Sequence, residues 1–331
     1  MKEDKVKTLR NLNRVKLEKV IPLATPFSIF VDTSSACNFQ CEFCAAHSPT
    51  SKERIAGRNM SLDMFEKIVD DMKEFPDKVK IVRLAHLGEP LLNPNLPEMI
   101  QYMRSADVTN KIEIITNGSL LNPGLNEKLI NSGVDMIRIS VEALDSDGYE
   151  KIAHYKIDYE KFVENIKDLF NRRKAGTTIY IKIADISVDS PEKKKIFMDT
   201  FEPYCDHIFI EHISPSWPEF ESDLINDEKI TMYGERIETV EICSQPFYYM
   251  IIGPDGKVTP CCADWEKKLE YGNVREQSLV NIWNGEKLRE FWRRMLIQKK
   301  KGIDLCGVCR NNEANPIDNI DKHAEEILKR I

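Results

Sequence analysis

The feature that most constrains the fold is an alternation of short apolar runs with longer amphipathic runs between Pro26 and Glu211. Apolar residues in the longer runs recur every three or four positions, which is typical of helices that bury one face. Repeats of strand and helix call for parallel strands joined by right-handed crossovers. The expected strands are Phe27–Val31, Val79–Ala85, Lys111–Thr116, Met136–Val141, Thr178–Ala184 and His207–Ile210. The expected helices are Ser61–Phe75, Leu96–Ser105, Asn126–Asn131, Tyr159–Lys174 and Pro191–Tyr204.

Six such repeats are too few for a closed eight-stranded barrel. We therefore expect an α/β fold, a partial (β/α)6 barrel of the TIM type, over residues 26–211, after an N-terminal extension over residues 1–25. Proline, serine and acidic residues follow the last strand, so residues 212–235 are expected to form a connector. Residues 236–331 are expected to form a small second domain. It would contain a hairpin turning at Gly253-Pro254-Asp255-Gly256 and one helix over Leu279–Gln298.

The charge and hydropathy of the chain exclude several classes of partner. The 331 residues carry a net charge of −7, which supplies no general attraction for nucleic acid or an anionic membrane. No apolar run approaches the length of a membrane span, and residues 1–23 lack the apolar core of a signal peptide. We therefore expect a cytoplasmic protein that binds neither nucleic acid nor membrane.

The nine cysteines are distributed unevenly along the chain. Disulfides are not expected, because cytosolic thiols are kept reduced. Three cysteines lie within eight residues near the N-terminus, five lie beyond residue 240, and only Cys205 falls between. This clustering favours ligation of a metal ion or a metal cluster.

Cys37, Cys41 and Cys44 form the first cluster, in the sequence Cys-Asn-Phe-Gln-Cys-Glu-Phe-Cys directly after the first expected strand. Active sites of such folds lie at the carboxyl ends of the strands, where these thiols are expected. Three protein ligands leave one iron of a [4Fe–4S] cluster open to a substrate or cofactor. Zinc is the alternative, but structural zinc takes four ligands, and no fourth ligand is obvious in this loop, although His47 is close.

This spacing resembles the signature of the radical S-adenosylmethionine (SAM) superfamily, including the aromatic Phe43 before the last cysteine. Gly88-Glu89-Pro90 resembles the family motif that holds the methionine amino group, with Leu87 where many members have glycine. Thr116-Asn117-Gly118 and Ser140-Val141-Glu142 resemble positions that contact the SAM ribose or carboxylate. Taken alone, Gly88-Glu89-Pro90 and Thr116-Asn117-Gly118 are more often turns. Their joint occurrence at successive strand ends favours the family.

The resemblance implies a specific chemistry. SAM would bind the open iron through its amino and carboxylate groups, and one electron from the cluster would release methionine and a 5′-deoxyadenosyl radical. That radical would take a hydrogen atom from an unactivated C–H bond. The family also implies a flavodoxin- or ferredoxin-type electron donor.

A second set of thiols lies in the C-terminal block and consists of Cys243, Cys261 and the Cys306-Gly307-Val308-Cys309 knuckle. Four thiolates complete the coordination of a [4Fe–4S] cluster or of zinc. The set resembles the SPASM and twitch extensions of radical SAM enzymes, which bind an auxiliary [4Fe–4S] cluster. No cysteine follows Cys309, so the shorter twitch-type form with one auxiliary cluster is expected. The set is most similar to that of the radical SAM aminocyclitol dehydrogenases that oxidise 2-deoxy-scyllo-inosamine.

The remaining candidate residues have alternative roles. Cys262 is the alternative ligand to Cys261, but the spacing from Gly256 favours Cys261. Cys205 and Cys262 are then spare, and we interpret them as buried inert thiols or, alternatively, as the hydrogen-atom donor of a radical epimerase. A general base is also needed. The candidates for it at strand ends or in loops are His47, Lys182, Glu211 and His212, together with His86 and Asp185.

The leading functional hypothesis is oxidation of a hydroxyl on a sugar, cyclitol or similar small polar metabolite to a carbonyl, with the auxiliary cluster as electron acceptor. A peptide- or protein-modifying maturase shares the same extensions. A small molecule is favoured over a peptide because about 26 residues precede the first strand, too few for an independently folded leader-peptide-binding domain. Radical epimerisation is the third hypothesis.

Overall fold

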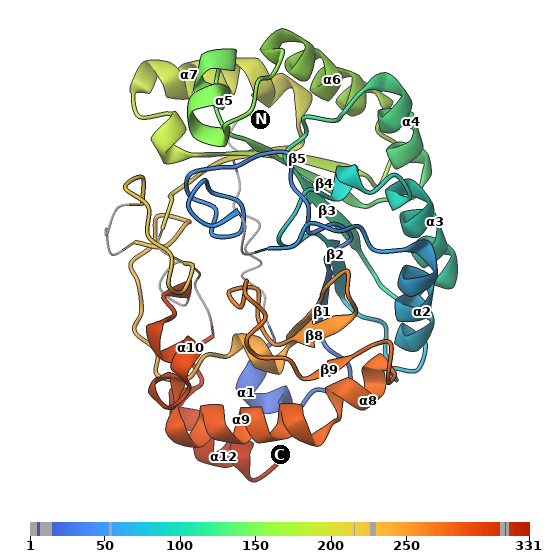
Figure 1. The fold of residues 1–331 in the computed structure, drawn as a ribbon, viewed down its shortest axis with the longest axis vertical. Helices are drawn as coiled ribbons and strands as arrows, with labels where there is room; N and C mark the ends of the chain where they lie inside the picture. Colours follow the sequence, from blue (N-terminus) through green and yellow to red (C-terminus); the bar gives the residue numbers. More distant parts are fainter. Residues whose placement is uncertain are drawn as a thin grey trace.

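In the computed structural model, nine strands form one curved sheet with helices packed on its outer face (Figure 1). The structure describes residues 5–6, 15–52, 55–214, 216–225, 230–311, 315 and 318–331. The strand order is β6-β5-β4-β3-β2-β1-β7-β8-β9. The strands are β1 Ser28–Val31, β2 Ile81–Leu84, β3 Ile112–Thr116, β4 Met136–Val141, β5 Thr178–Ala184, β6 His207–Glu211, β7 Tyr249–Ile252, β8 Lys257–Thr259 and β9 Gly272–Asn273.

The first six strands are parallel, each paired with the next in chain order. β6 and β9 lie at opposite edges of the sheet, which is therefore open rather than closed. The predicted α/β partial barrel is confirmed. All six of the strands expected from the sequence are present, and the bounds of β4 and β5 agree with the prediction to the residue.

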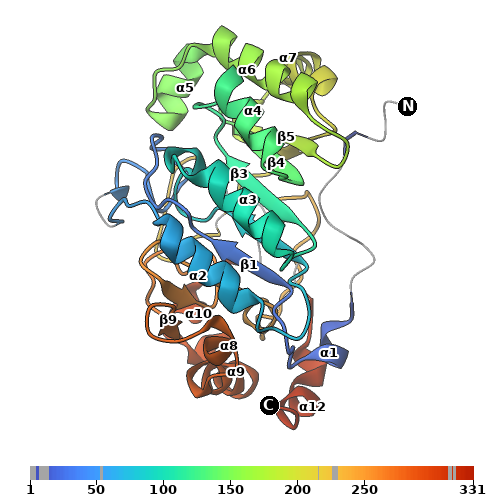
Figure 2. The ribbon, with the colours of Figure 1, turned by 90° about the vertical axis from the view of Figure 1, so that its right-hand side faces the viewer.

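Helices alternate with these strands as the periodicity predicted. Figure 2 shows α2, α3, α4 and α6 side by side across the outer face of the sheet. The Ser61 hydroxyl accepts a hydrogen bond from the Met64 amide and begins α2, while Gly133, at a φ of +87°, follows the end of α4. The helices of this part are α1 Leu17–Val20, α2 Leu62–Met72, α3 Leu96–Ala106, α4 Pro123–Asn131, α5 Ser146–Ala153, α6 Tyr159–Arg172 and α7 Pro191–Phe201.

Alternate residues of the strands enter two different environments. Ile114 of β3 and Ile139 of β4 are fully buried in the main apolar core. Their neighbours in sequence include Glu113 and Arg138, which form an ion pair in which Glu113 is 1% exposed. Arg83 of β2 completes the network at 2.9 Å from Glu113. Buried charges of this kind must be paired, and here they fill the barrel interior below the strand ends.

The C-terminal hairpin extends the barrel sheet instead of forming a separate one. β7 pairs in parallel with β1, and β8 returns antiparallel to β7 after a turn at Gly256, whose φ is +84°. The indole of Trp283 also donates to the Leu23 carbonyl at 2.8 Å, which ties the N-terminal segment to this block. The remaining α-helices among the described residues are α8 Leu279–Trp283, α9 Glu286–Gln298, α10 Asp304–Val308 and α12 Ala324–Leu328.

Several elements differ from the sequence prediction. The single helix expected over Leu279–Gln298 is two helices, because the chain is extended at Gly285, the N-cap of α9. A side chain at Gly285 would come within 2.9 Å of the Asn281 carbonyl oxygen. Helix α5 was not expected, although Asp145 caps it by accepting from the Gly148 amide. Among the described residues, none of the helices combines the length and hydrophobicity of a membrane span.

Candidate active site

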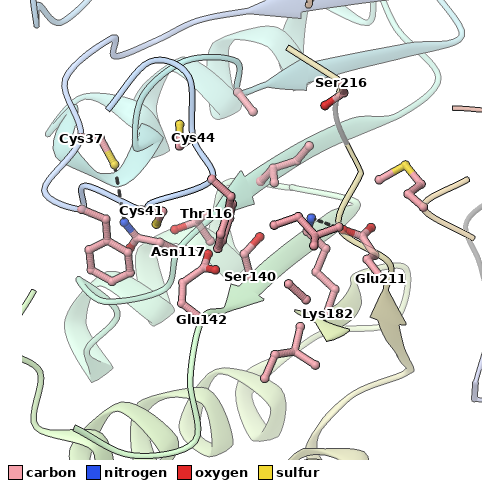
Figure 3. Close-up of a pocket in the computed structure, with 18 of the residues that line it drawn as sticks. Cys37, Cys41, Cys44, Thr116, Asn117, Ser140, Glu142, Lys182, Glu211 and Ser216 are labelled. Atoms are coloured by element: carbon pink, nitrogen blue, oxygen red, sulfur yellow. Dashed lines mark hydrogen bonds and ion pairs between the residues drawn. The ribbon is translucent and has the colours of Figure 1, made fainter. Parts of the chain in front are cut away.

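Cys37, Cys41 and Cys44 lie on one loop that follows β1 at the carboxyl ends of the strands (Figure 3). The loop is fixed to the C-terminal part of α5, since the amides of Gln40 and Glu42 donate to backbone carbonyls there at 2.8 and 3.1 Å. Burial raises the pKa of the Cys37 thiol to about 12. Binding to iron is what deprotonates thiols of this kind.

Gly88 lets the second motif approach this loop closely. The Glu89 amide donates to the Ala36 carbonyl at 2.8 Å. A Cβ atom at Gly88 would lie 2.2 Å from the Ser34 carbonyl oxygen, so only glycine fits. Leu87, which stands where many family members have glycine, packs in a small apolar cluster with Trp265.

The Glu89 carboxylate joins the motifs that follow β2 and β3. It accepts hydrogen bonds from the Thr116 hydroxyl at 2.6 Å and from the Asn117 amide at 2.7 Å. Burial raises the pKa of Glu89 to about 7. The Asn117 side chain reaches within 4.0 Å of the Cys37 sulfur. Pro90 begins a short 3-10 helix and does not line the cavity described next.

A cavity of about 390 Å³ opens beside the three thiols. Ser140 and Glu142, from the end of β4, lie on its wall together with Phe43. Burial raises the pKa of Glu142 to about 7, against the opposing effect of Lys182. The residues predicted from the family resemblance that line the cavity are Cys37, Cys41, Phe43, Cys44, Gly88, Glu89, Thr116, Asn117, Ser140 and Glu142.

The candidate bases divide into two groups. Lys182, Glu211 and His212 lie on the cavity wall, and the Lys182 ammonium is 2.5 Å from the Glu211 carboxylate. His47 does not line the cavity; it is buried, which lowers the pKa of its imidazole. The cavity wall also includes residues that no sequence motif marked. They include Ser214, Ser216, Trp217, Met232 and Asn315.

The second set of thiols surrounds a smaller, mostly apolar cavity, which is lined by Cys243, Cys261, Cys306 and Cys309. Burial raises the pKa of the Cys243 thiol to about 12. Cys262 instead lies on the wall of the main cavity. Cys205 is fully buried and lines neither cavity.

Both sets suit iron–sulfur clusters. Three thiols on one loop beside a cavity leave an iron open to a ligand, whereas four thiols around a small pocket can complete a cluster. Within the described parts of the chain, no three His, Cys, Asp or Glu side chains converge on a point that would hold a single metal ion. Ligands of a [4Fe–4S] cluster bind different irons, so their sulfurs need not converge in this way.

Comparison with known proteins gives the family. Residues 31–193 match the model of the Radical SAM superfamily, and residues 243–311 match that of SPASM, an iron–sulfur cluster-binding domain. The fold and its two thiol sets thus define an iron–sulfur enzyme. More particularly, the chain carries a Radical SAM domain over residues 31–193 and a SPASM domain over residues 243–311. These domains imply SAM, a [4Fe–4S] cluster and auxiliary iron–sulfur ligation.

Two curated relatives match most of the chain. The tungsten-containing aldehyde ferredoxin oxidoreductase cofactor-modifying protein of Pyrococcus furiosus is 25% identical over 301 residues, which cover 80% of this chain and 82% of that protein. The PqqA peptide cyclase of Granulibacter bethesdensis is 23% identical over 338 residues, which cover 88% of this chain and 81% of that protein.

Several solved structures share the fold. Streptococcus suis SuiB is 19% identical with a TM-score of 0.62, covering 82% of this chain and 69% of that one. The protein anSMEcpe with bound AdoMet is 16% identical with a TM-score of 0.60, covering 92% and 96%. BtrN in complex with AdoMet and 2-DOIA is 18% identical with a TM-score of 0.55, covering 86% and 93%.

Proposed function

We propose that this enzyme oxidises a secondary alcohol of a sugar, cyclitol or similar small polar molecule to a carbonyl, with one auxiliary [4Fe–4S] cluster as the electron acceptor. The observation that carries the proposal is the position of two consecutive cysteines. Cys261 lies among the four thiols of the second set, and Cys262 lies on the wall of the main cavity. The cavity and the auxiliary site are therefore separated at this point by a single peptide unit.

A cluster with four protein ligands has no open iron, so it is better suited to accept an electron than to bind a substrate. The two cofactor sites, when loaded, supply removal of a hydrogen atom from the substrate carbon and acceptance of one electron. The protein has to hold the alcohol at the cavity wall and take up the hydroxyl proton.

The lining of the cavity supports a small polar substrate. Lys182 and Glu211 form an ion pair on its wall, with side chains 22% and 11% exposed. Ser214 and Ser216 add hydroxyl groups from the segment after β6, and Asn315 adds an amide. Hydroxyl groups of a polyol would find both donors and acceptors among these side chains.

Two competing reactions remain as outcomes of the same test. Cys262 on the cavity wall favours hydrogen-atom return to a substrate radical, because a thiol S–H can donate a hydrogen atom. That reaction would be an epimerisation, with no net oxidation. The likeness to a peptide cyclase, at 23% identity, favours a peptide substrate instead.

The test is anaerobic turnover of the reconstituted enzyme with SAM, a reductant and a panel of polyols, hexoses and aminocyclitols. We expect a product two hydrogens lighter than the substrate, and deuterium transfer into 5′-deoxyadenosine from substrate deuterated at the carbinol carbon. The matched control is the triple variant Cys37→Ala, Cys41→Ala and Cys44→Ala. Deoxyadenosine without an oxidised product would contradict the proposal. Deuterium uptake from heavy water into a product of unchanged composition would establish epimerisation.

A further inference from the structure

The ends of β5 and β6 bring an acid and a histidine together at the cavity. Ala184 pairs with Glu211 in the parallel register of these strands, so Asp185 and His212 are the next residues along. The His212 Nδ1 atom lies 2.5 Å from the Asp185 Oδ2 atom. The other carboxylate oxygen of Asp185 accepts from the Ile213 amide at 3.1 Å, which fixes the acid in place. The His212 amide donates to the Met232 carbonyl at 3.0 Å.

This contact determines the tautomer of the imidazole. An ionised carboxylate only accepts hydrogen bonds, so Nδ1 of His212 must carry the proton. The lone pair of the neutral ring is then on Nε2. That atom is buried and has no hydrogen-bond partner among the described residues, while the His212 side chain lines the cavity. A buried polar atom without a partner is costly, and a ligand hydroxyl would satisfy it.

The other ionisable groups on this wall are less suited to accept a proton. Glu211 is engaged by the Lys182 ammonium at 2.5 Å. Glu142 belongs to the strand-end segment that resembles a SAM contact. His86 also lines the cavity, and its Nδ1 atom is likewise buried without a partner among the described residues, but its Nε2 atom is held by the neutral Cys262 carbonyl at 3.0 Å. Only His212 has a carboxylate to stabilise the positive charge of a protonated ring.

We propose that Nε2 of His212 accepts the hydroxyl proton of the substrate, with Asp185 as the positioning residue that holds the ring. This rests on the alcohol oxidation proposed above. The carbinol carbon loses its hydrogen atom to the SAM-derived radical, the hydroxyl proton passes to Nε2, and one electron passes to the auxiliary iron–sulfur cluster. The carbon–oxygen double bond forms as the O–H bond breaks, so two hydrogens and two electrons leave the substrate in total.

Two measurements on the holoenzyme test the role. The first is ¹⁵N NMR of histidine-labelled protein, which reports the tautomer without turnover. We expect an Nδ1-protonated ring whose signal is absent in His212→Gln and whose tautomer balance changes in Asp185→Asn.

The second measurement is the ratio of carbonyl product to 5′-deoxyadenosine with 2-deoxy-scyllo-inosamine, myo-inositol and glucosamine as probes. We expect this ratio to fall at least ~100-fold in His212→Gln, the usual range for loss of a general base.

Chemical rescue distinguishes a base from a structural side chain. Added imidazole should restore part of the carbonyl yield in His212→Gly. It should restore none in Asp185→Asn, because that variant retains the His212 imidazole. The matched control is His323→Gln, a histidine in the 3-10 helix Asp321–His323, outside the cavity, whose ratio should equal that of the wild type. An Nε2-protonated His212, or an unchanged ratio in His212→Gln, would overturn the assignment of His212 as the base and leave the proposed alcohol oxidation standing. Absence of carbonyl from the wild type with every probe would overturn the alcohol oxidation and the base role with it.

Discussion

Cys261 and Cys262 are consecutive in the chain, and Cys261 lines the small pocket whereas Cys262 lines the main cavity. Their sulfurs lie 3.7 and 3.4 Å from the same Tyr249 hydroxyl. Cys261 lies with three other thiols around the small pocket, and Cys262 lines the main cavity, as the first cysteine loop does. The Asp264 carboxylate holds the segment that follows, because it accepts hydrogen bonds from the amides of Lys268 and Leu269 at 2.7 and 2.8 Å.

Serine substitutions at this pair should have different effects on iron content. Cys261→Ser should lower the iron of the reconstituted protein from about eight atoms per chain to about four, because one of two [4Fe–4S] clusters loses a ligand. Cys262→Ser should keep about eight. Iron and sulfide analysis measures both, with Cys205→Ser as the control thiol. Loss of iron in Cys262→Ser, with full iron in Cys261→Ser, would exchange the two assignments.

Gly88→Ala should prevent assembly of the first cluster. The new methyl group would lie 2.2 Å from one carbonyl oxygen and 2.3 Å from another, both belonging to the backbone that leads into the cysteine loop. Such overpacking typically costs about 1–3 kcal/mol, and backbone atoms cannot move aside as side chains do. We expect reconstituted iron to fall by about half, as the loop is displaced.

Gly124→Ala is the matched control for that substitution. Gly124 lies in α4, and its nearest neighbour would be 3.5 Å from the added carbon. Alanine is favoured over glycine in a helix by up to about 1 kcal/mol, so this variant should keep its iron and be at least as stable as the wild type. Equal iron content in the Gly88 and Gly124 variants would contradict the close approach.

Glu113→Ala should destabilise the barrel in a pH-dependent way. Burial raises the pKa of the Glu113 carboxyl, but the guanidinium groups of Arg138 and Arg83 outweigh it and hold the pKa below its usual range. Removing one member of a buried ion network costs about 3–5 kcal/mol. Because the folded-state pKa is depressed, the carboxylate stabilises the fold above its unfolded pKa, and this contribution is lost as the pH falls through the folded-state pKa.

The difference in free energy of unfolding between wild type and Glu113→Ala should therefore be largest near neutral pH and shrink in acid. Guanidinium denaturation at several pH values measures it. The exposed Glu127→Ala on α4 is the control and should change stability by less than about 0.5 kcal/mol at any pH. A difference that is constant with pH would show that Glu113 acts through packing alone.

The bounds of β4 and β5 were predictable because apolar residues that are buried alternate along each strand with residues of intermediate exposure such as Arg138 and Lys182. The cysteine loop was predictable because its spacing is local. The long-range pairing of strands was not predictable, because nothing in Tyr249–Ile252 indicates that β7 would lie parallel to β1. The break between α8 and α9 at Gly285 was not predictable from the apolar periodicity, which continues through it. The close approach of the Asn281 carbonyl, which leaves no room for a side chain at Gly285, exists only in the folded chain.

The site shows the same division between local and spatial information. The sequence placed Asp185 and His212 at strand ends but gave no reason to pair them, since their contact depends on the register of β5 with β6. Asn315 on the cavity wall had no signal at all, because its only link to the site is spatial. His47, which is near the thiols in sequence, does not line the cavity.

The Tyr249 hydroxyl should tune the auxiliary cluster. It lies 3.7 Å from the Cys261 sulfur and donates to the Gln245 side chain at 2.9 Å. An iron-bound thiolate only accepts hydrogen bonds and, being charged, is a stronger acceptor than the Gln245 amide oxygen, so we expect the one hydroxyl proton to turn to the Cys261 sulfur when the cluster is bound. Hydrogen bonds to cluster sulfurs raise the reduction potential. Tyr249→Phe should therefore move the auxiliary potential to more negative values by tens of millivolts, while iron content stays at about eight per chain. A redox titration followed by electron paramagnetic resonance measures the shift.

Tyr102→Phe is the control, because it removes a hydroxyl that bonds to Asp70 on the outer helices, and it should leave both potentials unchanged. A potential that is the same in Tyr249→Phe and the wild type would place this hydroxyl outside the electron-accepting site.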